Sequence, residues 1–130
     1  MAFVTVVLLL ALIQYIYFSI AVGRARGRHG ISAPATSGDE MFERFYRAHQ
    51  NTLEQLVLFI PAIVAAGYFS HALIAAAVGL LFIVGRALYF RSYVKDPESR
   101  GTGMIMTLIS SVVLLAMGLI GAVRTLLLQL

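Results

Sequence analysis

Three polar residues in one stretch of the chain have types and spacing that suit ligand binding. Arg47, Asn51 and Glu54 are spaced four and three residues apart, so a helix would place their side chains on one face. A guanidinium group can hold a carboxylate through two parallel hydrogen bonds. The lone carboxylate of Glu54 suits an ammonium group. This spacing indicates a site for a small ligand that carries carboxylates and an amine.

A second polar cluster lies further along the chain. Arg86, Tyr89 and Tyr93 would also share one helical face. If the chain turns back at Ser70, then Glu54 and Arg86 each lie 16 residues from the turn, or about 24 Å along their helices. The two clusters are therefore predicted to meet at the same depth.

Long apolar helices must position these clusters. Hydrophobic residues make up 60% of the 130 residues and charged residues 12%, which is about half the charged fraction of a soluble domain. Because a membrane-spanning helix needs about 20 residues, we predict an all-α membrane protein with one domain, a four-transmembrane-helix bundle. The predicted helices cover about residues 2–22, 38–68, 72–95 and 104–123.

The expected ends of these helices depend on local signals. Met1 to Val22 carries no charged residue, so it is predicted to be a retained helix and not a signal peptide. Ser37 and Glu40 have the spacing of a capping box and are predicted to open the second helix. The six acidic residues and nine of the ten basic residues lie between Arg24 and Arg100. The positive-inside rule then places the polar loops in the cytoplasm.

Two simpler explanations compete with a ligand site. Arg47 and Glu54 could only lock helices together as an ion pair, and Tyr89 and Tyr93 could only anchor the membrane interface. A charge inside a spanning helix costs about 2.5 to 3.5 kcal/mol, and such residues usually face a bundle interior. The region also holds more arginine than Glu54 can neutralise, which favours an anion-binding pocket.

Other residues indicate less specific roles. His29, His49 and His71 lack ligand-like spacing and the chain has no cysteine, so no metal site is expected. Arg24 and Arg28 are expected at lipid headgroups. Small residues of the last helix are expected at close helix contacts: Ser110, Ser111, Gly118 and Gly121.

One segment resembles a known family signature. Residues 43–54, with the sequence ERFYRAHQNTLE, are similar to the signature of the MAPEG family, the membrane-associated proteins in eicosanoid and glutathione metabolism. Residues 86–100 resemble the matching segment of leukotriene-forming members, and the likeness covers nearly the whole chain. The resemblance implies four helices per chain and a homotrimer with glutathione at the subunit interfaces.

The resemblance also implies roles for residues on the first two helices. Arg26 and Arg47 would hold carboxylates of glutathione. Asn51 and Glu54 would hold its backbone and amine, and His49 would lie close by.

Residues on the other side of the peptide are implied in the same way. Tyr89 and Tyr93 would line glutathione, and Arg100 would face its sulfur as the catalytic residue. The chain departs from leukotriene-forming members at Gly27, where they have a second arginine, and at Gln55, where they have an aromatic residue. These departures favour a glutathione transferase of broad scope.

The expected function is therefore that of a multi-pass enzyme of the bacterial inner membrane. It would activate glutathione as a thiolate, because a nearby arginine lowers the pKa of a thiol, and attack hydrophobic electrophiles or lipids supplied by the membrane. Glutathione peroxidase activity would use the same thiolate. The alternative is a non-enzymatic lipid-presenting member of the fold. A small multidrug exporter is disfavoured because residues 1–22 hold no carboxylate, and no nucleic acid partner is expected.

Overall fold

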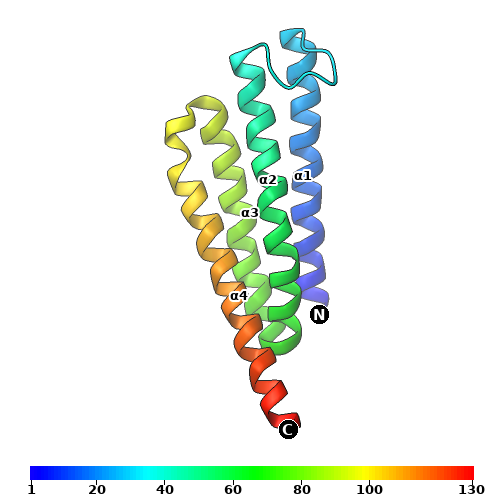
Figure 1. The fold of residues 1–130 in the computed structure, drawn as a ribbon, viewed down its shortest axis with the longest axis vertical. Helices are drawn as coiled ribbons and strands as arrows, with labels where there is room; N and C mark the ends of the chain where they lie inside the picture. The colour runs from blue at the N-terminus through cyan, green and yellow to red at the C-terminus, as the bar shows by residue number, and fades with distance from the viewer.

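The chain folds into four antiparallel α-helices, which Figure 1 shows side by side in a computed structural model that describes residues 1–130. They are α1 (Ala2–His29), α2 (Glu40–Ala66), α3 (Ala72–Lys95) and α4 (Gly101–Gln129). The α1–α2 loop and the α3–α4 connection lie at one end of the bundle. Both termini and the α2–α3 hairpin lie at the other end (Figure 1). The predicted all-helical architecture is confirmed.

The first helix is longer than the sequence indicated. The apolar run ends at Val22, but α1 continues to His29, because leaving the apolar layer does not by itself end a helix and arginine is a good helix former. The helix stops at Gly30, which has a φ of 67° and whose N–H donates to the carbonyl of Arg26. Glycine adopts this left-handed conformation without steric cost. At the other end of the chain, α4 also extends beyond the predicted 104–123.

The start of α2 differs from the predicted capping box. Asp39, and not Ser37, is the N-cap, and its carboxylate accepts the N–H of Phe42 at 2.9 Å. Glu43 completes the cap by accepting the N–H of Gly38 at 3.0 Å. Glu40 instead pairs with Arg44 on the next turn. The acceptor therefore lies two residues later than predicted, which moves the helix start from residue 38 to Glu40.

The turn between the two site-bearing helices lies where it was expected. A single π-helical turn, η1 (Gly67–His71), joins α2 to α3 around Ser70. By length and composition, three helical segments are apolar enough to cross a membrane: Ala2–His29, Glu40–Lys95 and Pro97–Gln129. The middle segment contains the α2–α3 hairpin, so it folds back on itself (Figure 1).

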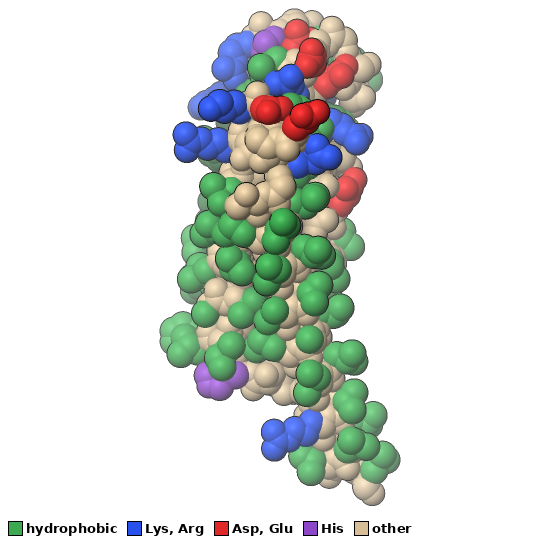
Figure 2. Space-filling model, turned by 90° about the vertical axis from the view of Figure 1, so that its left-hand side faces the viewer, with side chains coloured by type: hydrophobic (Ala, Val, Ile, Leu, Met, Phe, Trp, Pro, Cys, Tyr) green, Lys and Arg blue, Asp and Glu red, His purple; other side chains and the backbone are tan.

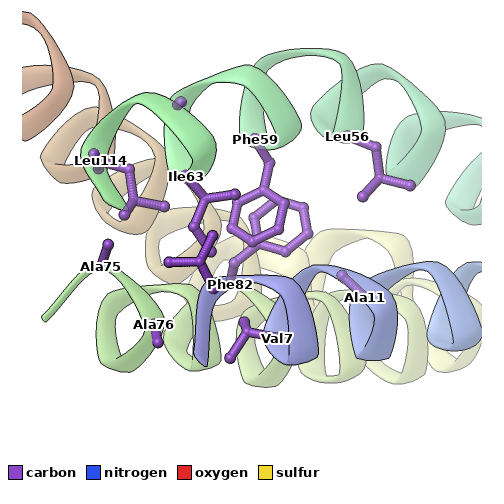
Figure 3. Close-up of a cluster of buried hydrophobic side chains, with 12 residues drawn as sticks. Val7, Ala11, Leu56, Phe59, Ile63, Ala75, Ala76, Phe82 and Leu114 are labelled. Carbon is purple, nitrogen blue, oxygen red and sulfur yellow. The ribbon is translucent and has the colours of Figure 1, made fainter. Parts of the chain in front are cut away.

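An apolar core holds together the part of the bundle that is nearer the α2–α3 hairpin. Phe59 of α2 stacks on Phe82 of α3 with ring centroids 3.9 Å apart, and Val7 of α1 and Leu114 of α4 join the same cluster (Figure 3). On α4 the small residues predicted at helix contacts are buried: Ser110, Ser111, Gly118 and Gly121. Close packing through small residues is the usual way for helices to associate in lipid.

Charged side chains gather at one end of this bundle. Figure 2 shows acidic and basic groups at the end that carries the α1–α2 loop, above a belt of hydrophobic side chains. Large apolar side chains are exposed along all four helices, among them Tyr17, Val57, Val84 and Leu119. Such a belt matches the hydrocarbon layer of a bilayer.

Candidate functional site

A small polar pocket lies between α2 and α3 at the charged end of the bundle. Its volume is about 210 Å³ and seven residues line it: Arg47, Gln50, Asn51, Glu54, Tyr89, Tyr93 and Arg100. Six of the eight residues predicted for the site are thus brought together by the fold. The hairpin makes this possible, because it places the two polar clusters at the same level of neighbouring helices.

A buried arginine does not line this pocket but holds one of its lining residues in place. The side chain of Arg86 is 1% exposed, and its Nη2 donates to Asn51 Oδ1 and to Thr52 Oγ1, both at 2.9 Å. Its guanidinium also lies 4.2 Å from the centroid of the Tyr89 ring. No carboxylate pairs with it. Because arginine only donates hydrogen bonds, it fixes the oxygen of Asn51 inward and leaves the amide N–H groups free for a ligand.

Two stacked phenols form the α3 wall. The rings of Tyr89 and Tyr93 lie 5.6 Å apart with an interplanar angle of 18°. Tyr89 is buried because α4 approaches it closely at Gly103, where an added Cβ would lie 2.7 Å from Tyr89 Cα. The close approach of α4 thus holds this wall in position.

A short turn places Arg100 at the pocket. Arg100 ends the 3₁₀ turn η2 (Pro97–Arg100), and its Nη1 donates to the carbonyl of Pro97 at 2.7 Å. Asp96 caps the turn by accepting the N–H of Glu98 at 3.2 Å. These local bonds restrict the guanidinium to the edge of the pocket.

The charges in the pocket do not neutralise one another. Arg47 and Arg100 face one acid, Glu54, and none of the three forms an ion pair. Elsewhere in the structure, Arg44 pairs with Glu40, and His29 Nδ1 lies 3.1 Å from Asp39 Oδ1. Within one chain, Arg47 and Glu54 therefore do not lock helices together as an ion pair. The pocket keeps a surplus of positive charge that an anionic ligand would offset.

Two predicted residues lie outside this pocket. Arg26 donates from Nη1 to the carbonyl of Ala35 at 2.6 Å, and its guanidinium lies 4.8 Å from the Phe42 ring centroid. His49 stacks on Tyr15 with centroids 4.6 Å apart, and its buried Nε2 has no hydrogen-bond partner. Within one chain, neither side chain lines the site.

Two contributors were not among the predicted site residues. Gln50 lines the pocket one helical turn before Glu54, and nothing in its type set it apart. Arg86 was placed in the second polar cluster but was given no role in the site. The position of Arg86 along its helix could have indicated a role in the site, because a charged side chain so far along an apolar helix must find partners in the bundle.

Comparisons with known proteins place the chain in context. The sequence model of the MAPEG family matches residues 3–120. The chain is 43% identical over 100 residues to microsomal glutathione S-transferase 2 of Mus musculus, covering 77% of this chain and 68% of that protein. It is 34% identical over 120 residues to leukotriene C4 synthase of Mus musculus, covering 92% and 80%. An uncharacterised protein of Synechocystis is 39% identical over 121 residues, covering 93% and 85%.

Proposed function

Because the chain belongs to the MAPEG family, we propose that this multi-pass membrane protein is a glutathione transferase that acts on hydrophobic electrophiles. The observation that carries the proposal is the pocket between α2 and α3. It combines the free N–H groups of the Asn51 amide with two guanidinium groups and one carboxylate that form no ion pair. Glutathione offers the complementary groups, with a carboxylate at each end, an amine and peptide carbonyls.

Each polar group of the pocket has a role in holding this peptide. Arg47 binds a carboxylate through its fork, and Glu54 binds the ammonium group. The N–H groups of Asn51 donate to a carbonyl or carboxylate, because its oxygen is already held by Arg86. Tyr89 and Tyr93 flank the peptide backbone. Preorganised donors of this kind reduce the cost of ordering on binding.

The chemical step uses the sulfur of the bound peptide. Arg100 lies beside the sulfur and stabilises its thiolate, and the thiol proton passes to solvent. The thiolate is the nucleophile. It forms a carbon–sulfur bond to the electrophile, and either a leaving group departs with the electron pair or the pair moves onto a conjugated acceptor. With a hydroperoxide, the same thiolate and a second glutathione would yield the alcohol, water and glutathione disulfide.

The proposal also accounts for Arg26 and His49, which lie outside the pocket within one chain. In a homotrimer, Arg26 and His49 of one copy would face the pocket of the next, so the complete site would form between chains. By its name, the relative described above as a microsomal glutathione S-transferase uses glutathione, which supports glutathione as the ligand of the site. All four helices would cross a bacterial inner membrane, with the charged end in the cytoplasm.

Measurements of glutathione binding and of turnover test this proposal. The protein is purified in mild detergent, glutathione binding is measured by calorimetry, and turnover is measured with 1-chloro-2,4-dinitrobenzene and with cumene hydroperoxide. Saturable binding with turnover of the aryl halide is expected. Binding without turnover of either substrate would favour the lipid-presenting alternative, and absence of binding would refute the proposal.

A further inference from the structure

A second and larger cavity opens near the charged end, between α1, α2 and α3. Its volume is about 720 Å³, and it shares no lining residue with the pocket of the proposed glutathione site. Nothing in the transferase chemistry uses it. It combines two features that suit a lipid, a group of cations that form no ion pair and an apolar groove.

The cations of this cavity lie on α1 and α3. Arg24 and Arg28 of α1 and Arg91 and Lys95 of α3 all line it, and no acidic residue does. None of these four side chains donates a hydrogen bond or joins an ion pair in the structure. Like charges that converge in this way repel one another unless an anion lies between them.

The apolar part of the cavity begins directly beyond the cations. Phe18 and Phe90 stack at 4.0 Å to form its base, and the Phe45 ring packs edge-on against Phe90. Tyr17, which is 63% exposed, lies seven residues before Arg24, or about 10 Å deeper toward the hydrocarbon layer. Ala87 lies one turn deeper than Arg91 on the facing helix. The gap between α1 and α3 thus runs from a cationic mouth into an apolar groove.

From this arrangement we infer that the cavity binds one anionic phospholipid, with its phosphate among the four cations and an acyl chain along the groove. Guanidinium forks match phosphate oxygens. A soluble anion would leave the apolar groove unfilled, and a zwitterionic lipid would bring an ammonium group toward four cations. The cavity is built from one chain and does not require the proposed glutathione site.

The absence of tryptophan allows a sharp test. The full-length Tyr17→Trp variant is reconstituted in phosphatidylcholine vesicles that contain a minor fraction of brominated phosphatidylglycerol, whose bromine atoms quench only neighbouring indole rings. Leu108→Trp is the control, because Leu108 is 56% exposed on α4 at a similar distance beyond Arg100 and lines neither cavity. We expect the indole of the Tyr17→Trp variant to be quenched several times more strongly by brominated phosphatidylglycerol than by an equal fraction of brominated phosphatidylcholine. The indole of the control should be quenched equally by both lipids.

Second-site changes separate the two parts of the proposed site. In the Tyr17→Trp background, Arg24→Gln with Arg91→Gln should reduce the preference for the anionic lipid by roughly tenfold or more, because each cation contributes to anionic lipid binding. Arg124→Gln, at the opposite end of the bundle, should leave it unchanged. Ala87→Phe should fill the groove and remove the preference without a change in charge.

Four results would overturn the inference. The first is equal quenching of the indole at residue 17 by the two lipids, and the second is a loss of the lipid preference with Arg124→Gln as large as with Arg24→Gln and Arg91→Gln. The third is a preference that survives Ala87→Phe. The fourth is displacement of the lipid by inorganic phosphate at constant ionic strength. The last result would identify a site for a free anion.

Discussion

The Nη2 of Arg86 lies 2.9 Å from the Oδ1 of Asn51, so a buried cation on α3 sets the orientation of a polar residue on α2. The same nitrogen reaches Thr52 Oγ1, whose hydroxyl in turn donates to the carbonyl of Ala48. Arg86 thus connects the hairpin to the pocket without lining it. Its unpartnered Nε leaves the bonds to Asn51 and Thr52 as its main polar contacts.

The first prediction concerns this positioning role. Arg86→Met keeps a long apolar side chain but frees Asn51 to rotate, so the donors no longer face the ligand in a fixed way. A lost hydrogen bond to a charged group costs about 1.5 to 3 kcal/mol, and we expect glutathione affinity measured by calorimetry to fall by at least tenfold. Arg91→Met, an exposed change on the same helix, is the control. Equal affinity in both variants would show that Asn51 does not depend on Arg86.

The second prediction concerns the opposite charges in the pocket. Arg47→Ala and Glu54→Ala should each weaken glutathione binding by about 1.5 to 3 kcal/mol, because each leaves a charged ligand group without its partner. A glutathione analogue that lacks the amine should bind the Glu54→Ala variant almost as tightly as it binds the unchanged protein, because it has no ammonium group for Glu54 to hold. If calorimetry gave unchanged affinity in both variants with the fold intact, these residues would not hold the ligand.

The third prediction tests whether the site is shared between chains. Native mass spectrometry in mild detergent should show a trimer. Arg26→Ala and Arg47→Ala should each inactivate the protein, because each change removes a different half of the same interface. Random mixed assemblies of the two variants should regain about a quarter of the wild-type activity, since that fraction of interfaces pairs two intact halves. No recovery on mixing, with exchange of subunits demonstrated, would refute a site shared between chains.

The fourth prediction concerns the support that α4 gives to the site. At Gly103 an added Cβ would lie 2.7 Å from both Gly85 O and Tyr89 Cα, whereas at Gly101 it would meet nothing within 4 Å. Overpacking of this kind costs about 1 to 3 kcal/mol. Gly103→Ala should therefore lower the melting temperature in detergent and weaken glutathione binding, and Gly101→Ala should leave binding unchanged. A stable Gly103→Ala variant with normal affinity would contradict the close packing.

The sequence was enough to predict which polar residues meet in the pocket, because the depth of a residue along an apolar helix follows from the number of residues between it and the turn. Glu54 and Arg86 lie equally far from Ser70, and the hairpin places their clusters together. The start of α2 was less predictable, because Ser37 and Asp39 are both good capping residues and only the backbone path decides which one reaches an N–H group. The separation of Arg26 from the pocket was not predictable from spacing, because it depends on how α1 packs against α2.

The fifth prediction separates binding from chemistry at Arg100. If its guanidinium stabilises the thiolate, its effect falls on a charge that forms only at the sulfur, while the rest of the peptide is still held by Arg47, Asn51 and Glu54. Arg100→Ala should then leave glutathione affinity nearly intact and raise the pKa of the bound thiol. A rise of one or two pKa units, about 1.4 to 2.8 kcal/mol, cuts the thiolate fraction near pH 7 by about 10- to 100-fold.

Two measurements should change together in the Arg100→Ala variant. The ultraviolet absorbance of the bound thiolate and the rate with the aryl halide should both fall, and both should recover in part as the pH rises, because a thiol with a raised pKa ionises at higher pH. Arg100→Lys keeps the positive charge and should retain most of both signals, although it loses the bond geometry that ties the guanidinium to Pro97. A variant without this cation that keeps the full thiolate signal and rate would mean that another group, such as Tyr93, activates the sulfur.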